Sequence, residues 1–275
     1  MKKSSFLFSL FSILFLVACN QPQQLVILHT NDTHSQVEPK ENGQGGYARR
    51  MGLIAQERKA NKNVLLVDAG DFSQGSPYFN FYRGRVEIEA MNYMGYDAGT
   101  LGNHEFDNGL DTLAMVLKLA NFPIVCANYD FTGTPLEGLV QPYTIVERSG
   151  VKIGIFGLGC KPEGIISDKN FKPAVYLEPY PVAQQMADTL RAQGCGVVVC
   201  LSHMGTFGKA RGEANDSAMV AQTRGIDAVI GGHTHQLNKI RVANMDGDSI
   251  PVVQMGKSGV YLGKIVLDLC DKSKK

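Results

Sequence analysis

Short runs of apolar, β-branched residues alternate along the chain with segments in which apolar residues recur every three or four positions. The first pattern predicts buried strands and the second predicts amphipathic helices. Strands are expected at 25–28, 64–67, 98–101, 124–127, 197–201 and 228–230, and helices at 47–59, 86–94, 110–120, 182–192 and 217–224. Repeated strand–helix units of this kind favour a layered α/β sandwich of mixed sheets with the helices outside.

Two further pairs of strand-like segments interrupt this alternation. Segments 143–147 and 152–156 flank a turn sequence that contains Ser149 and Gly150, so they predict a hairpin. Segments 250–255 and 260–268 also resemble paired strands. The Gly- and Pro-rich loops are short and the sequence contains no internal repeat, so we expect one domain over residues 25–275.

The N-terminus has the pattern of a secretion signal. A basic start precedes an apolar run at 6–17, which is shorter than the roughly 20 residues that a membrane-spanning helix needs. The run ends in Leu-Val-Ala-Cys at 16–19, which resembles a bacterial lipoprotein box. We therefore expect residues 1–18 to be a lipoprotein signal peptide and residues 19–24 to be a lipidated cysteine with a short tether. A plain secretory signal with an incidental Cys19 is the alternative.

This N-terminal pattern predicts a protein of the bacterial cell envelope, anchored to a membrane through lipid on Cys19 and facing the periplasm. The 27 Lys and Arg residues against 26 Asp and Glu residues give a formal net charge of +1, which argues against a nucleic-acid polymer as partner. The cysteines after Cys19 form no Cys-x-x-Cys pair, so they are expected as buried small side chains and not as zinc ligands. A disulfide such as Cys195–Cys200 stays open.

The residues that could bind metal or take part in catalysis follow the ends of five predicted strands. These residues are Asp32 and His34 after the first strand, Asp71 after the second, Asn103 and His104 after the third, His203 after the fourth, and His233 and His235 after the fifth. A single Asp or His in such a place is more often a turn former or a helix cap. Five strand ends with imidazole, carboxylate and amide donors, however, indicate a metal centre suited to Zn, Mn or Fe, because the carboxyl ends of strands are where α/β sheets form sites.

The same segments resemble the calcineurin-like metallophosphoesterases, and within them the 5′-nucleotidase family. The matching segments are 30–34, 70–75, 102–107, 202–203 and 232–235, and the Asn-His-Glu-Phe-Asp form at 103–107 is specific to the nucleotidase branch. The resemblance implies the metallo-dependent phosphatase fold, which is a four-layer α-β-β-α sandwich of two mixed sheets. It also implies two divalent metal ions, whose identity among Zn, Mn and Fe is open.

The resemblance further implies a role for each residue. Asp32, His34 and His235 would hold one metal ion, Asn103, His203 and His233 would hold the second, and Asp71 would bridge the two. Water held between the ions would attack phosphorus. His104 would contact the phosphate or protonate the leaving oxygen, and Asp107 would fix its ring and raise its pKa. Alternatively, Asp107 caps the helix that begins near Gly109, which is compatible with that role.

Two other groups of residues have weaker signals. His29 lies at the end of the first strand and is expected to be a structural imidazole or one that supports a ligand. Arg49, Arg50, Arg83 and Arg85 are candidate phosphate contacts, but the helical pattern at 47–59 predicts that Arg49 and Arg50 lie on a solvated face.

The expected function is release of phosphate from nucleotides or related phosphoesters. The resemblance leaves open 2′,3′-cyclic nucleotide phosphodiesterase, UDP-sugar hydrolase and thiosulfate-ester hydrolase activities. From another class, the alternative is a noncatalytic subunit or binding module that pairs with a separate nucleoside-binding chain. Members of the family carry a C-terminal substrate-binding domain, and we expect it to be absent here because a short Lys-rich tail follows the closing strand.

Overall fold

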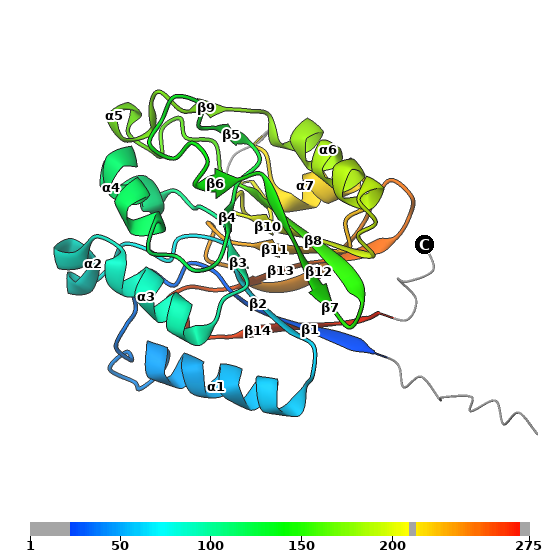
Figure 1. Cartoon of the computed structure of the whole chain (residues 1–275), viewed down its shortest axis with the longest axis horizontal. Helices are drawn as coiled ribbons and strands as arrows, with labels where there is room; N and C mark the ends of the chain where they lie inside the picture. Colours follow the sequence, from blue (N-terminus) through cyan, green and yellow to red (C-terminus); the bar gives the residue numbers. More distant parts are fainter. Residues whose placement is uncertain (1–22, 209–212, 270–275) are drawn as a thin grey trace, which may run out of the picture.

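A computed structural model describes residues 23–208 and 213–269. The predicted signal peptide, Cys19 and Cys270 lie outside the described residues. Within the described ranges, no helix is long and apolar enough to cross a membrane. Figure 1 shows helices on both outer sides of two central sheets, which confirms the predicted four-layer α-β-β-α sandwich.

The first sheet has six strands. Their order is β14 (Gly263–Asp268), β1 (Gln24–Thr30), β2 (Val64–Asp68), β3 (Ala98–Gly99), β4 (Ile124–Val125) and β6 (Val140–Gln141). Strand β14 runs antiparallel to β1, whereas the other neighbours are parallel. The carboxyl ends of β1, β2 and β3 therefore lie together at one end of the strands. The start of β1 and the end of β14 lie at the opposite end.

The second sheet also has six strands. Their order is β12 (Leu237–Ala243), β13 (Ser249–Met255), β11 (Ala228–Gly231), β10 (Val197–Ser202), β8 (Val151–Leu158) and β7 (Tyr143–Arg148). The hairpin predicted at 143–156 is confirmed as the antiparallel pair β7 and β8. A small third sheet joins β5 (Tyr129–Asp130) to β9 (Val175–Tyr176).

One predicted pairing is wrong. Segments 250–255 and 260–268 form strands, but β13 pairs with β11 and β12, while β14 pairs with β1 in the other sheet. The chain crosses between the sheets through the turn at 256–259, where Gly256 and Gly259 have positive φ. Alternating hydrophobicity marks each strand but does not specify its partner, which is why the sequence pattern missed this crossing.

Seven α-helices and one short 3₁₀ helix occur in the described part of the chain. Their bounds are α1 (Tyr47–Ala60), α2 (Pro77–Tyr82), α3 (Arg85–Met94), η1 (His104–Phe106), α4 (Gly109–Leu117), α5 (Asp168–Phe171), α6 (Pro179–Ala192) and α7 (Asp216–Ala221). The five predicted helices are confirmed, with ends shifted by up to three residues. The sequence pattern did not predict α2 and α5, which are only six and four residues long.

Three apolar clusters hold the layers together. One packs α1, α3 and α4 on the outer face of the first sheet, through residues such as Ile54 and Ile88. The second lies between the sheets and includes Ile27 and Val199, and the third packs α6 and α7 on the outer face of the second sheet. Because successive side chains of a strand point to opposite faces, β1 contributes to two clusters, which fixes its register and the position of the loop after it.

Cys126, Cys160, Cys195 and Cys200 are free thiols buried in the structure. This confirms the interpretation of these four residues as small buried side chains and removes the Cys195–Cys200 disulfide.

Candidate metal centre

The loops after β1, β2, β3, β10 and β11 converge at one end of the sandwich. Five of the predicted ligands in these loops have a left-handed backbone, with φ of 47° at Asp32, 46° at His34, 54° at Asp71, 74° at His233 and 56° at His235. This conformation is uncommon for residues other than glycine and costs about 1–3 kcal/mol for each residue that adopts it. Such a concentration of strained residues is typical of a functional site.

Asp32, His34, Asp71 and His235 form the first donor group, here called the Asp32 group. One ligand atom from each lies within 4.8 Å of the others. The Nε2 atoms of His34 and His235 are 2.9 Å apart, and Nε2 of His235 is 3.4 Å from Oδ1 of Asp32. Two carboxylates and two imidazoles in this arrangement suit a divalent cation of the Zn, Mn or Fe type.

Asn103, His203 and His233 form the second donor group, the His203 group. Nδ1 of His233 lies 2.9 Å from Oδ1 of Asn103, and the rings of His203 and His233 are 5.3 Å apart between centroids. Nδ1 of His203 lies 2.7 Å from the carbonyl oxygen of Ala69, so this nitrogen donates and Nε2 is left to act as a ligand atom.

The surroundings of the His203 Nε2 atom indicate whether a metal ion fits beside it. The His203 side chain is fully buried, and Nε2 has no hydrogen-bond partner among the described residues. That nitrogen lies 3.1 Å from Oδ2 of Asp71 and 3.8 Å from Oδ1 of Asp32. A buried imidazole nitrogen that lacks a partner and faces two carboxylates fits a divalent cation.

Asp71 belongs to the Asp32 group and also faces the His203 group, in agreement with the bridging role that the family resemblance implies. Its Oδ2 faces His203, and its Oδ1 accepts a hydrogen bond of 2.9 Å from the backbone N–H of His104. Burial acts to raise the pKa of Asp71, but the nearby histidines, His203 first and then His104 and His34, together hold that pKa below its ordinary value. Asp71 is therefore a carboxylate, the form that binds metal.

Gly102 allows Asp71 and His203 to approach each other. A Cβ atom at this position would lie 2.2 Å from Oδ1 of Asp71 and 2.7 Å from Nε2 of His203. Any side chain at position 102 would therefore occupy the space between the two ligands.

His104 and Asp107 meet beside the two donor groups. Nδ1 of His104 is 2.9 Å from Oδ2 of Asp107, and the His104 ring lies 5.4 Å from that of His34. Burial acts to lower the pKa of His104, but its hydrogen bond to Asp107 and the nearby carboxylates raise it overall. Helix α4 begins at Gly109 with Asn108 in the capping position, so the Asp107 carboxylate serves His104 and not the helix.

Glu105 is a buried residue of the site to which sequence reasoning assigned no role. Its Oε2 accepts hydrogen bonds from the backbone N–H of Asp71 at 2.9 Å and of Gly102 at 2.6 Å, and its Oε1 accepts one from Ser73 at 3.0 Å. Burial and the nearby Asp71 raise the pKa of Glu105 to about 7. Glu105 thus holds two ligand-bearing loops together, and its place inside the 102–107 segment was the signal available for it.

Two buried amides support the loops in a similar way. Asn31 donates to Oδ2 of Asp32 at 2.5 Å and to the carbonyl oxygen of Gly256 at 2.9 Å. Gln254 in β13 donates to the carbonyl oxygen of Gly232 and accepts from Thr234 at 3.0 Å. Gln254 is fully buried, and its place within the apolar run at 250–255 was the sequence signal available for it.

His29 lies apart from both donor groups. Its ring packs against Gly263, where a Cβ atom would come within 2.1 Å. Burial and the Lys239 charge lower the pKa of His29 to about 3. A neutral, packed imidazole agrees with the structural interpretation.

The prediction for Arg50 is wrong. Its side chain is only 4% exposed and its guanidinium lies 5.1 Å from the centre of the Tyr47 ring, because Arg50 shares the inner face of α1 with Ile54. Arg49 is on the solvated face as predicted and donates to the carbonyl oxygen of Gly43. Arg83 is exposed, and Arg85 pairs with Glu89 on the surface of α3.

A four-layer sandwich with carboxylate, amide and imidazole donors at converging strand ends defines a class of metal-dependent phosphoesterases. The chain matches the calcineurin-like phosphoesterase family over residues 25–237 and belongs to this family.

Similar proteins narrow the class. The chain is 36% identical to the snake venom 5′-nucleotidase of Naja atra, over 91% of this chain and 51% of that protein. It is 32% identical to the 5′-nucleotidase of Homo sapiens, over 90% of this chain and 47% of that protein. The chain spans about half the length of the curated relatives it matches.

Two solved structures agree with this assignment. The 5′-nucleotidase precursor of Thermus thermophilus gives a TM-score of 0.82 at 34% identity, over 91% of this chain and 52% of that chain. The calcineurin-like phosphoesterase YfkN of Bacillus subtilis gives a TM-score of 0.75 at 33% identity, over 90% of this chain and 85% of that chain.

Proposed function

We propose that this chain is a dinuclear-metal-dependent hydrolase that releases phosphate from nucleoside monophosphates and related phosphoesters. The observation that carries this proposal is the position of Asp71 between two donor groups, with the hydrogen-bonded pair His104 and Asp107 beside them. The 5′-nucleotidases among the relatives support the choice of nucleotides among possible phosphoesters.

The predicted ligands divide between two cations of the Zn, Mn or Fe type. Asp32, His34 and His235 would hold one, Asn103, His203 and His233 the other, and Asp71 both. When bound, such cations supply positive charge to the phosphoryl oxygens and acidify water. The polypeptide contributes the positioning, because backbone hydrogen bonds and buried amides hold the ligand loops before substrate arrives.

His104 is the residue positioned to donate a proton to the leaving group. Asp107 engages its Nδ1 at 2.9 Å, so Nε2 is the ring atom that can donate to the oxygen of the departing alcohol. Asp107 fixes the ring, and the carbonyl oxygen of Asp107 in turn accepts a hydrogen bond of 2.9 Å from Asn170 in α5. The loop that carries the proton donor is thus braced from a second direction.

A substrate panel tests the proposal. The metal-free protein is loaded with Mn, Zn or Co. Phosphate release is then measured from AMP and p-nitrophenyl phosphate, and the nucleoside monophosphate products of 2′,3′-cyclic AMP and UDP-glucose are measured by chromatography. We expect AMP to be hydrolysed and a chelator to abolish the activity. Two bound metal equivalents without hydrolysis of any of these substrates would contradict the proposal and favour the noncatalytic alternative. Faster hydrolysis of the cyclic nucleotide or the UDP-sugar would reassign the substrate.

We also propose that the protein is anchored through lipid on Cys19 at the periplasmic face of a bacterial membrane, on the strength of the sequence at 16–19. Cys19→Ala should move the protein from the detergent phase to the aqueous phase of fractionated cells. Cys195→Ala is the matched control, since Cys195 lies within the folded domain, and it should not change partitioning. Membrane retention of the Cys19→Ala protein would exclude the anchor.

Two sources of nucleoside recognition are compatible with this site. One is a separate nucleoside-binding chain or domain, and the other is a surface of the described domain itself.

A further inference from the structure

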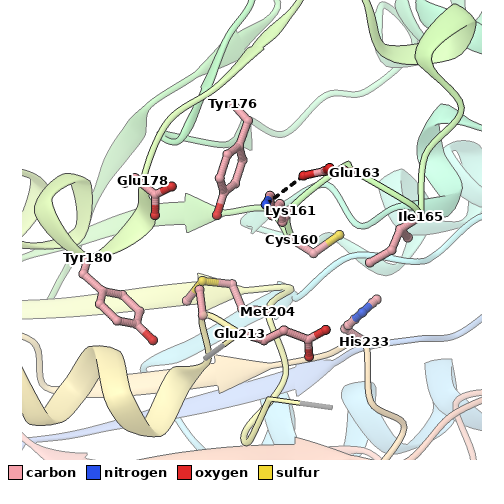
Figure 2. Close-up of a pocket in the computed structure, with 11 residues that line it drawn as sticks. Cys160, Lys161, Glu163, Ile165, Tyr176, Glu178, Tyr180, Met204, Glu213 and His233 are labelled. Atoms are coloured by element: carbon pink, nitrogen blue, oxygen red, sulfur yellow. Dashed lines mark ion pairs between the residues drawn. The ribbon is translucent and has the colours of Figure 1, made fainter. Parts of the chain in front are cut away.

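A pocket of about 410 Å³ adjoins the metal centre. Figure 2 shows it between Tyr176, Tyr180 and Met204 on one side and Ile165 and His233 on the other. His233 belongs to both places, because it lines the pocket while its Nδ1 lies 2.9 Å from Asn103 in the His203 group. The pocket and the His203 group therefore share one residue.

The walls of the pocket are set by the second sheet. Cys160 follows the end of β8, Met204 follows β10 and His233 follows β11, and the carboxyl ends of neighbouring parallel strands are where such crevices form. Tyr176 is held by the pairing of β9 with β5, and the hydroxyl of Tyr180 accepts a hydrogen bond of 3.0 Å from the backbone N–H of Asn215. The pocket is thus formed before a ligand enters.

The chemistry of the lining suits a flat organic group. Two tyrosine rings, the Met204 thioether and the Ile165 side chain provide apolar surface of the kind that packs against aromatic rings. At the rim, Glu163 pairs with Lys161 at 2.8 Å, and the Glu178 carboxylate can accept hydrogen bonds from hydroxyl and amino groups. The volume falls within the range of about 300–1,000 Å³ that is typical of small-ligand sites.

The pocket is also linked to the proposed proton donor. The segment from Cys160 to Phe171 forms one wall through Ile165, and its Asn170 donates to the carbonyl oxygen of Asp107. A leaving group seated in the pocket would therefore lie against the segment that braces the His104 loop.

We propose that this pocket binds the nucleoside portion of a nucleoside monophosphate whose phosphate lies at the metal centre. The domain then contains its own nucleoside subsite, with the base packed against Tyr176. This inference rests on the proposed function for its substrate, but the pocket itself can be tested without turnover.

The first experiment compares AMP with ribose 5-phosphate, which lacks the base. Tyr176→Ala should lower kcat/KM for AMP by about 5–150-fold, the range for loss of one base–aromatic stacking contact, and change kcat/KM for ribose 5-phosphate by less than about twofold. Tyr176→Phe keeps the ring and should retain the value for AMP. Tyr93→Ala is the matched control, because Tyr93 is 80% exposed on α3, and it should change neither substrate.

A second measurement separates this inference from the proposed function. Calorimetry of adenosine with the metal-loaded protein should show binding that Tyr176→Ala weakens by the same factor. If the wild-type protein hydrolyses neither substrate yet binds adenosine through Tyr176, the proposed function fails and the subsite stands. Equal loss for both substrates, unchanged rates, or adenosine binding that ignores the substitution would overturn the subsite.

Tyr176 packs partly against the first apolar cluster, so Tyr176→Ala carries a risk of misfolding. Ile165→Ala is the second variant, because Ile165 is 47% exposed and its truncation should leave the fold intact. It should lower kcat/KM for AMP and spare ribose 5-phosphate, and equal effects on the two substrates would again reject the subsite.

Discussion

The two donor groups of the metal centre are held in different ways. In the His203 group, His203 is fully buried and its Nδ1 is fixed by the carbonyl oxygen of Ala69. In the Asp32 group, the His235 side chain is 36% exposed and its Nε2 faces His34 and Asp32. The His203 imidazole is thus fixed by the interior, whereas the His235 imidazole belongs to a partly exposed loop, even though Asp32 and Asp71 of the same group are buried.

The difference indicates how the site is assembled. Ser202, next to His203, hydrogen-bonds the buried Asp216 at the start of α7, so the second sheet and its helix layer hold this ligand in position. His34 and His235 occupy strained loop positions and lack comparable interior support among the residues that the structure describes. We infer that folding alone positions His203, while metal binding contributes most to ordering His34 and His235.

The largest effect is expected from the residue that the two groups share. Asp71→Asn removes the negative charge that lies between the two donor groups, so metal content should fall and turnover should drop at least about 10²-fold, since loss of a residue that merely supports a ligand already costs about 10–100-fold. Elemental analysis and phosphate release measure the two effects. A variant that keeps two metal equivalents would show that each donor group binds its metal without the Asp71 carboxylate, which would refute the bridging role.

Substitution of His203 and of His235 tests most directly whether one is fixed by the interior and the other by a loop. In metal-free protein, His203→Ala should lower the free energy of unfolding by about 2–5 kcal/mol, because it leaves a buried cavity. His235→Ala should change that free energy by less than about 0.5 kcal/mol, as is usual at a partly exposed site. Urea unfolding in the presence of a chelator measures both changes. Equal changes in the free energy of unfolding would remove the distinction between an interior-fixed His203 and a loop-held His235.

A third substitution probes chemistry without disturbing either group. His104→Ala should keep the metal content and lose about 10²–10⁴-fold in turnover, the usual contribution of a positioned acid or base. Metal analysis serves as the internal control. An unaltered rate would show that the proton reaches the leaving oxygen from another source.

The smallest effect on the site is expected from the residue that supports the loops. Glu105→Gln keeps the size but replaces one of the two acceptor oxygens with an amide nitrogen that cannot accept. At least one of the three backbone N–H groups then loses its acceptor, so metal affinity should fall about 10–100-fold. Glu89→Gln is the control, since Glu89 pairs with Arg85 on the surface. Metal titration with a competing chelator measures the change, and equal affinities in the two variants would assign Glu105 a role in folding alone.

The fold and the members of the site could be predicted from the sequence more completely than the contacts that hold the ligand loops in place. Strand ends are local features, so Asp32, Asp71 and His203 could be found before their contacts were known. The crossing from β13 to β14 could not, because pairing between distant segments depends on the whole sandwich. Arg50 was misplaced for a related reason, since a long polar side chain on the inner face of α1 can pack over Tyr47.

The direction of β1 has a practical consequence. Gln24, at its start, pairs with Asp268 at the end of β14, while its last residue, Thr30, leads into the loop of Asp32. Seven residues of extended chain therefore separate the first strand residue from the metal centre, which is roughly 20 Å at about 3.3 Å per residue. A protein immobilised on a bead or electrode through its N-terminal end would present the metal centre to the solution and leave the entrance for substrate clear.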